Sequence, residues 1–360
     1  MITDNTALGK FIQPLRNEGI AALDTEFVWR DTARARMALV QLADAAGESA
    51  ALDCLEVPAP EPLAALLRDA GTVKILHDAQ QDLWHLRHFT GAAPVNVFDT
   101  QLAAAFCGCP RQVSLQKLVQ ETLGVELPKT ETVSNWCRRP LTPAQVDYAL
   151  DDVRYLGRAR EILRERAARA GTREWMEEDM KRYDDPELYA APEPRDAWRR
   201  VKCGRVRLDA AGYGRLRALA ATREEMSQLW DLPKSWLTED GSLAEIAANG
   251  DLRFRHRLPR KELRGQLTEC YTEALKTAEP LDAAEIAAVF PRYSPETLKA
   301  ADAAMEWLKT RAGEMGLEPG LIANRAAVTA WVATPNARSP LARGWRHEHA
   351  GREIAEKFRG

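Results

Sequence analysis

The run GIAALDTEFV, residues 19–28, decides the fold of the first half of this 360-residue chain. Its largely apolar character predicts a buried β-strand. Residues i and i+2 of a strand project from the same face, so Asp24 and Glu26 point in one direction. Two carboxylates in apolar surroundings are costly to bury unless a cation neutralises them. Oxygen-rich clusters suit Mg²⁺ or Mn²⁺; the alternative is a strand end whose acids reach solvent.

Strand-like and helix-like stretches alternate around this run. Residues 36–42 and 49–53 are predicted to continue it as an antiparallel meander. The stretches that follow predict, in order, a helix over 58–70, a strand over 73–77, a helix over 82–89, a strand over 95–98, helices over 101–106 and 114–123, and one long helix over 142–170. This order predicts an α/β domain in which helices flank a mixed sheet.

The second half of the chain has a different pattern of predicted secondary structure. Residues 173–200 are polar and punctuated by prolines, which is typical of a linker. From residue 200 to the end we find helical periodicity and no convincing strand. We therefore predict four parts: an α/β domain over 1–175, a linker over 176–200, and all-α domains over 201–282 and 283–360.

Composition favours a globular cytoplasmic protein. No apolar run approaches the roughly 20 residues that span a bilayer, and the first residues lack the features of a signal peptide. The six cysteines are scattered, so we predict free thiols. Acids outnumber bases in residues 1–190, and bases outnumber acids in 191–360. Such a chain can hold a carboxylate-rich metal site and a polyanion, although ordinary surface variation explains the charge equally well.

Two later motifs add acids to the strand pair. In HDAQQDL, residues 77–83, a strand gives way to a helix, where ligands commonly bind in α/β sheets. Asp78 there is predicted to cap the helix, and Asp82 lies one turn further in. Tyr148 and Asp152 share a helix face at i and i+4, whereas Asp151 is rotated toward solvent. Each motif alone also matches an ordinary surface helix.

Taken in order, four acids and a tyrosine resemble the DEDD exonuclease superfamily, in its tyrosine-bearing branch. The sequence around these residues resembles that of the ribonuclease D family in five stretches: LDTEF at 23–27, HDAQQDL at 77–83, FDTQLA at 98–103, SNWCRRPL at 134–141 and YALDDVRYL at 148–156. One departure is Asn135, where the family often has aspartate. The resemblance implies an RNase H-like exonuclease fold for residues 1–175 and helical HRDC-like domains for 201–282 and, more divergent, 283–360.

This resemblance also implies a function. The chain is expected to be a 3′→5′ exoribonuclease that releases nucleoside 5′-monophosphates by two-metal catalysis, with two Mg²⁺ or Mn²⁺ ions. Asp24, Glu26, Asp82 and Asp152 are the expected metal ligands. Tyr148 is expected to orient the attacking water, because a phenol is a poor base at its usual pKa.

The expected partner is RNA, specifically tRNA precursors with free 3′ ends, and no membrane or obligate protein partner is evident. Two alternatives remain open: a DNA 3′→5′ exonuclease of the same superfamily, and a non-catalytic nucleic-acid-binding protein. Candidate substrate contacts are aromatic, amide and cationic side chains near the motifs: Phe27, His77, Gln81, Trp84, Lys129, Arg138 and Arg139. For each of them, an ordinary core or rim position is the competing interpretation.

Overall fold

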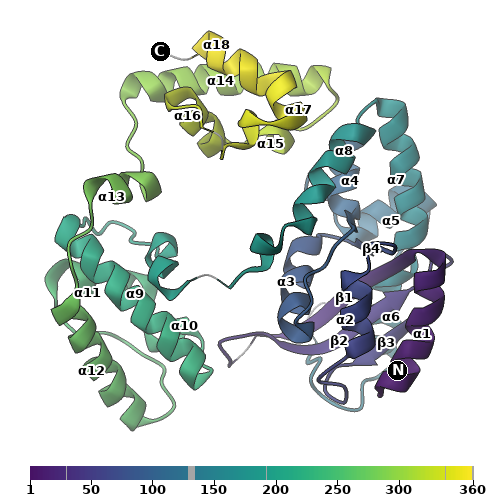
Figure 1. Ribbon diagram of the computed structural model, residues 1–360, viewed down its shortest axis with the longest axis horizontal. Coiled ribbons are helices and arrows are strands. Elements are labelled where there is room, and N and C mark those ends of the chain that lie inside the picture. Colours follow the sequence, from purple (N-terminus) through teal and green to yellow (C-terminus); the bar gives the residue numbers. More distant parts are fainter. Residues whose placement is uncertain (30, 129–133, 192, 337, 359–360) are drawn as a thin grey trace. The chain divides into compact units, whose positions relative to one another are not determined.

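The computed structural model describes residues 1–29, 31–128, 134–191, 193–336 and 338–358 (Figure 1). Its contacts divide the chain into two compact units. Unit 1 comprises Met1–Val28, Met37–Tyr189 and Tyr293–Gly360, and unit 2 comprises Trp29–Arg36 and Ala190–Arg292. Within the described ranges, no helix combines the length and the apolar character that crossing a membrane requires.

A five-stranded mixed sheet forms the centre of unit 1, in the order β3-β2-β1-β4-β5. The strands are β1 Ile20–Val28, β2 Arg36–Ala43, β3 Ser49–Asp53, β4 Val73–Leu76 and β5 Val97–Asp99. β4 runs parallel to both β1 and β5, and β2 runs antiparallel to β3. The mixed sheet is therefore confirmed, and the strand that carries Asp24 and Glu26 is its central one.

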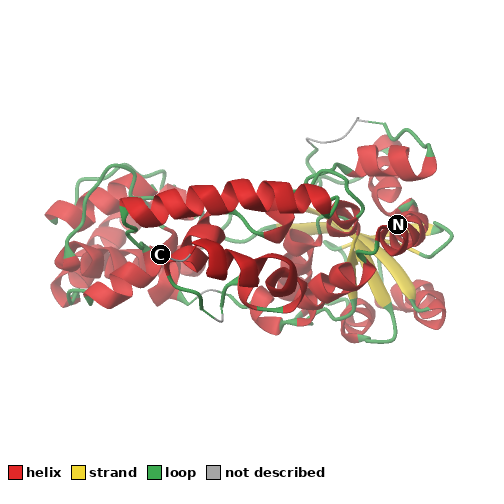
Figure 2. Cartoon of the chain, turned by 90° about the horizontal axis from the view of Figure 1, so that it is seen from above, coloured by secondary structure: helices red, strands yellow, loops and turns green. Residues whose placement is uncertain are grey.

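Helices pack around this sheet, and in Figure 2 the strands gather near the N-terminus while the rest of the described chain is helix and loop. The helices of the first part of unit 1 are α1 Asn5–Glu18, α2 Glu61–Arg68, α3 Ala79–Thr90, α4 Thr100–Phe106, α5 Leu115–Leu123, α6 Pro143–Arg154, α7 Leu156–Ala170 and α8 Arg173–Met180. Its C-terminal part contributes α14 Pro295–Glu314, α15 Pro319–Ile322, α16 Arg325–Ala333, α17 Gly344–Arg346 and α18 Arg352–Phe358.

The single long helix predicted over 142–170 is wrong, because the structure contains two helices. α6 ends and α7 begins at Tyr155. No proline or glycine stands at the break. Gly157, two residues later, lies so close to the β2–β3 turn that an added Cβ would be 2.9 Å from the Ala45 carbonyl oxygen. Tertiary packing on the sheet therefore ends the helix where the sequence pattern alone would continue it.

Residues 176–200 are largely structured. They contain the end of α8 and three 3₁₀ helices, η1 Lys181–Asp184, η2 Pro186–Tyr189 and η3 Pro194–Arg200. Tyr183, Tyr189 and Trp198 are buried within this range. Buried aromatic side chains anchor this segment to the hydrophobic cores. Its prolines therefore lie among short helices, and the segment is not an unstructured linker.

The C-terminal helices pack against the α/β part of unit 1. Arg346 forms an ion pair with Asp179 of α8, and the Trp345 indole donates to the same carboxylate at 3.0 Å. Both Trp345 and Asp179 are buried. The four-part division stays a prediction, but this packing groups residues 293–360 with the first unit instead of with 201–292.

Unit 2 is a helical body with its own core. Its helices are α9 Ala210–Trp230, α10 Lys234–Leu237, α11 Asp240–Asn249, α12 Lys261–Thr277 and α13 Ala283–Val289. Leu216 and Leu219 of α9 and Tyr271 of α12 are fully buried in that core together with Trp198 of η3. This body also includes residues 29–36, which follow β1 directly along the chain.

Candidate active site

Three carboxylates from β1 and α6 come together in unit 1. One oxygen each of Asp24, Glu26 and Asp152 lies within 4.8 Å of the others. Asp24 and Glu26 are brought to one face by the strand alternation, and α6 packs against β1 with Asp152 on the side that faces them. A group of three acids at this separation offers the oxygen ligands that hard divalent cations prefer.

The fourth acid, Asp82, lies in the first turn of α3. Its charge raises the pKa of both Asp24 and Glu26, which shows that it lies in the same electrostatic environment. Thr25, buried between the two acids in sequence, donates a hydrogen bond from its hydroxyl to the Asp82 carboxylate. Sequence reasoning did not single out Thr25, because its partner Asp82 lies 57 residues away along the chain.

All four carboxylates have raised pKa values. Burial is the largest cause for each of them, and neighbouring acids add to it. The pKa of Glu26 rises to about 8, and those of Asp82 and Asp152 rise to about 7. Mutual repulsion in a buried place is the condition that a bound divalent cation relieves, so the residues present fit a metal centre.

Tyr148 lies one helical turn before Asp152 on α6, as the i, i+4 spacing predicts. Its hydroxyl lies near the Asp152 carboxylate and lowers the pKa of that group, against the larger effect of burial. Burial and the surrounding acids raise the pKa of this phenol further above its usual value, so it stays protonated. The Trp136 ring stacks on Tyr148 with ring centroids 6.2 Å apart, which fixes the direction of the hydroxyl.

The start of α3 is held by Asp99 rather than by its own N-cap residue. Asp78 occupies the N-cap position with φ 58°, and its side chain makes no capping hydrogen bond. The buried Asp99 carboxylate instead accepts hydrogen bonds from the backbone amides of Asp78 and Ala79 at 3.1 and 3.2 Å. The predicted capping role of the Asp78 side chain is therefore wrong, because a neighbouring strand supplies the acceptor.

The aromatic and amide residues predicted to contact substrate lie around this turn. Phe27 packs on His85, with ring centroids 4.1 Å apart, and Trp84 packs on His88 at 3.8 Å. Both nitrogens of His77 lie 3.0 Å from protein oxygens, those of the Thr100 hydroxyl and the Val113 carbonyl. Gln81 is exposed. Of these residues, His77 has its hydrogen-bonding groups committed within the protein.

The predicted phosphate contacts differ among themselves. Arg139 makes a two-point ion pair with Asp53 and donates to the carbonyls of Trp136 and Ala38, so its guanidinium fastens the segment before α6 to the sheet. This geometry supports a structural role for Arg139. Arg138 is exposed, and Lys129 lies outside the described residues.

Comparison with known proteins agrees with this arrangement. Residues 1–168 match a family of 3′–5′ exonucleases. The whole chain is 32% identical to a ribonuclease D of Sphingobium indicum and covers 94% of that protein. A ribonuclease D of Pseudomonas paraeruginosa is also 32% identical, over 98% of this chain and 96% of that one. The chain belongs to the ribonuclease D family.

Its fold is that of the family as well. The crystal structure of Escherichia coli RNase D covers 100% of this chain and 99% of its own, with a TM-score of 0.85 and 26% sequence identity. The expected RNase H-like exonuclease domain followed by helical domains is thus confirmed, as is the enzyme class, a 3′→5′ exoribonuclease. Exonucleases of this kind use divalent metal ions, which the acidic cluster fits.

Proposed function

We propose that this ribonuclease D family member hydrolyses the last phosphodiester of RNA and releases nucleoside 5′-monophosphates from the 3′ end. Asp24, Glu26, Asp82 and Asp152 would hold two Mg²⁺ or Mn²⁺ ions. The single observation that supports this assignment most is the meeting of Asp24, Glu26 and Asp152 within 4.8 Å. Repulsion among these buried acids is the second support.

Two bound divalent cations supply an activated hydroxide and neutralise charge on the phosphate and the leaving oxygen. The chain's own residues arrange the rest. Asp24, Glu26 and Asp152 would hold the ions, since their carboxylate oxygens meet within 4.8 Å. Asp82 would add a fourth carboxylate, and the Thr25 hydroxyl donates a hydrogen bond to it.

Tyr148 would position the attacking water. Because its pKa is raised, the phenol stays protonated and acts as a hydrogen-bonding group rather than as a general base. Its hydroxyl lies near the Asp152 carboxylate, where it would hydrogen bond with a water held at the acids.

Tyr148→Phe is expected to lower kcat about 10–100-fold with little change in KM, because orientation of one water is lost while the acids remain. The ring still stacks on Trp136, so the melting temperature should change by no more than about 2 °C. Steady-state release of nucleotides from a short RNA measures the effect. A phenylalanine variant with unchanged kcat would remove Tyr148 from the reaction.

Metal binding is expected to stabilise the protein more at pH 8 than at pH 6. The folded-state pKa values of Glu26, Asp82 and Asp152 lie at about 7 to 8, above their unfolded values. The metal-free folded state therefore loses stability as pH rises through this range, and a divalent cation offsets the loss. Thermal unfolding is measured with and without roughly 5 mM Mg²⁺. The rise in melting temperature on adding Mg²⁺ should be at least about 2 °C larger at pH 8 than at pH 6. Equal gains at both pH values would contradict the assignment.

We infer an RNA substrate, and specifically tRNA precursors with 3′ trailers, from the family resemblance. E. coli RNase D is described as an exoribonuclease involved in structured RNA processing. The direct test uses 5′-labelled RNA and matched DNA strands with free 3′ ends, incubated with Mg²⁺ or Mn²⁺. Progressive shortening of RNA, abolished by EDTA, supports the proposal. Faster shortening of DNA would favour a DNA exonuclease, and binding without shortening would favour a non-catalytic protein.

Three further expectations accompany this function. We propose that the chain acts in the cytoplasm, that it works without an obligate protein partner, and that it needs no membrane. The exposed Arg138 and Gln81 stay candidate substrate contacts, together with the aromatic residues Phe27 and Trp84.

A further inference from the structure

Two buried side chains of α8 and η1 contact Asp99, a residue of β5. The Tyr183 hydroxyl donates to the Asp99 carboxylate at 2.6 Å, and the Asp99 backbone amide donates to the Met180 sulfur at 3.3 Å. Both Tyr183 and Met180 are buried in the core of unit 1. The end of α8 and the start of η1 therefore bind Asp99 through its side chain and its backbone together.

Asp99 connects these elements to one acid of the metal centre. Its carboxylate accepts hydrogen bonds from the backbone amides at the start of α3, those of Asp78 and Ala79. Asp82 lies in the first turn of the same helix. The position of the Asp82 carboxylate therefore depends on where the Asp99 carboxylate is held.

The end of α8 is bound in turn by the C-terminal helices. Arg346 of α17 makes a two-point ion pair with Asp179, in which one guanidinium nitrogen lies 2.7 Å from the second carboxylate oxygen. The same guanidinium donates to the Leu321 carbonyl of α15 at 2.8 Å. Asp179 directly precedes Met180, whose sulfur accepts from the Asp99 amide. One arginine thus joins α15 and α17 to the residues that contact Asp99.

The Trp345 ring makes a second connection between the same parts. It packs edge-on against Phe106 with ring centroids 5.6 Å apart, and it stacks on Trp175 of α8 at 5.4 Å. Phe106 is the last residue of α4, the helix that begins directly after Asp99. Residues of α17 therefore support both helices that adjoin Asp99, α4 after it in sequence and α8 beside it in space.

These bonds are buried, so removing one partner has a larger effect than at the surface. Loss of the Arg346 guanidinium would leave the Asp179 carboxylate, which is 7% exposed, without its counter-charge. Loss of the Tyr183 hydroxyl would leave one oxygen of Asp99 without its donor. Residues that hold metal ligands in place without touching the metal typically change metal affinity about 10–100-fold when they are substituted.

We propose that Tyr183 and Arg346 are positioning residues of the metal centre, which act through Asp99 on Asp82. The C-terminal helices thereby take part in metal binding. They hold α8 and η1, these hold the Asp99 carboxylate at the start of α3, and the Asp82 carboxylate is oriented before a cation binds. The inference rests on the proposed function, because it concerns Asp82 as a metal ligand.

Binding of Mn²⁺ to the full-length protein without RNA tests this proposal independently of catalysis. Electron paramagnetic resonance of the free ion measures the affinity. Tyr183→Phe keeps the ring and should bind Mn²⁺ about 10-fold more weakly. Arg346→Gln, which acts one contact further away, should bind at least about 3-fold more weakly. Arg346→Lys keeps the charge but not the two-point geometry, and should restore part of the loss.

The double variant Tyr183→Phe with Arg346→Gln tests whether the two residues share one route. If both act through Asp99, the double variant should lose less affinity than the two single losses multiplied together. Such coupling is the evidence that a route through the structure requires, since spatial order alone does not establish one. Losses that multiply fully would overturn the shared route.

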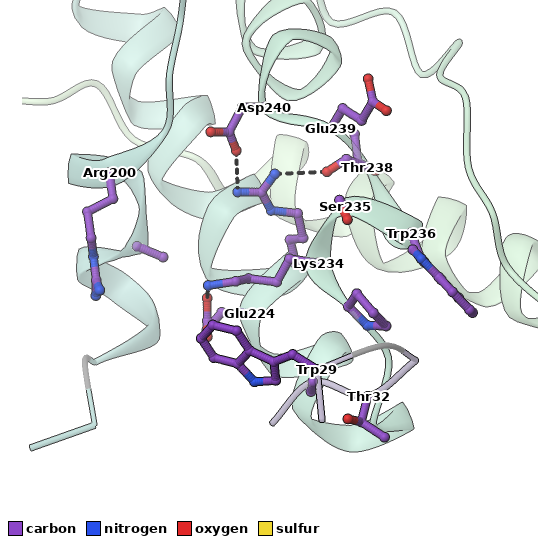
Figure 3. A pocket seen from close by; sticks show the side chains of 14 residues that line it. Trp29, Thr32, Arg200, Glu224, Lys234, Ser235, Trp236, Thr238, Glu239 and Asp240 are labelled. Carbon is purple, nitrogen blue, oxygen red and sulfur yellow. Dashed lines mark hydrogen bonds and ion pairs between the residues drawn. The ribbon is translucent and has the colours of Figure 1, made fainter. Parts of the chain in front are cut away.

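The matched controls remove the same two kinds of group from unit 2. The buried Tyr271 hydroxyl donates to the Thr238 hydroxyl at 3.1 Å. The buried Arg223 donates to the Thr238 carbonyl at 2.8 Å and pairs with Asp240 at 2.9 Å (Figure 3). Tyr271→Phe and Arg223→Gln should lower the melting temperature and leave Mn²⁺ binding unchanged. Weaker binding by these controls, or unchanged binding by the two test variants, would overturn the proposal.

Hydrogen–deuterium exchange separates failure of this inference from failure of the proposed function. In the metal-free protein, the amides of Asp78 and Ala79 should exchange at least about 10-fold faster in Tyr183→Phe, because their acceptor is held less firmly. Arg346→Gln should change their exchange in the same direction, and unchanged exchange in both variants would contradict the inference. If the unmodified protein binds no Mn²⁺, the proposed metal ligands are wrong, whereas the exchange rates still decide whether these residues hold the start of α3.

Discussion

Asp24→Asn is expected to lower kcat by about 10⁴-fold, because a metal ligand supplies several kcal/mol of charge stabilisation in the transition state. The same change should raise the melting temperature of the metal-free protein at pH 8. Asp24 is surrounded by Asp82, Asp152 and Glu26, whose charges raise its pKa, so an uncharged amide removes repulsion from the folded state. Single-turnover nucleotide release and thermal unfolding in EDTA measure the two effects.

Because kcat should fall while the melting temperature rises, the two measurements distinguish a role of Asp24 in catalysis from a role in folding. A variant that is both inactive and less stable would show that Asp24 holds the fold rather than a metal. Asp147→Asn is the matched control, since Asp147 is exposed on α6 one turn before Asp151. It should keep nearly full activity and stability. Near-normal nucleotide release by Asp24→Asn would disprove the proposed metal ligands.

Sequence patterns with a local physical cause predicted the structure well. The alternation of β1 places Asp24 and Glu26 on one face, and the helical spacing places Tyr148 beside Asp152. Both relations depend only on backbone geometry, so a single sequence is enough to infer them. The cap of α4 is local in the same way, because the Asp99 carboxylate accepts from amides of the helix that follows it.

Features that depend on distant contacts were missed. Helix α1 carries no strong motif, yet Leu8, Ile12 and Leu15 bury one of its faces. The break at Tyr155 follows from the close approach of Gly157 to the β2–β3 turn. The sequence predicts a phosphate contact for Arg139, because its ion-pair partner Asp53 lies 86 residues earlier and leaves no local signal. Long-range partners of this kind leave no periodic signal.

Asp99 makes both local and long-range contacts. Its substitution is expected to be the most destabilising change near the site. The carboxylate accepts from the amides of Gln101 and Leu102 in its own helix, at 2.9 and 3.2 Å, and from the two amides that start α3. It also accepts from the Tyr183 hydroxyl at 2.6 Å. One buried side chain therefore caps two helices and fastens η1 to the sheet.

Asp99→Ala should lower the free energy of unfolding by about 3–5 kcal/mol, since each buried amide left without an acceptor costs roughly 1–3 kcal/mol. Activity should fall as well, because α3 carries Asp82 in its first turn. Asp99→Asn keeps one acceptor oxygen and should lose about half as much stability. Chemical denaturation measures both variants.

A substitution of Asp78 serves as the control, because it tests whether the start of α3 is capped by Asp78 or by Asp99. Asp78→Asn should change stability by less than about 0.5 kcal/mol, because its side chain makes no capping bond and asparagine tolerates a positive φ. If Asp78→Asn were as destabilising as Asp99→Ala, the local cap inferred from the sequence would be the true one. If instead only the Asp99 variants lose stability, the orientation of Asp82 depends on a carboxylate from the neighbouring strand. Catalysis would then be coupled to a residue that contacts neither metal nor RNA.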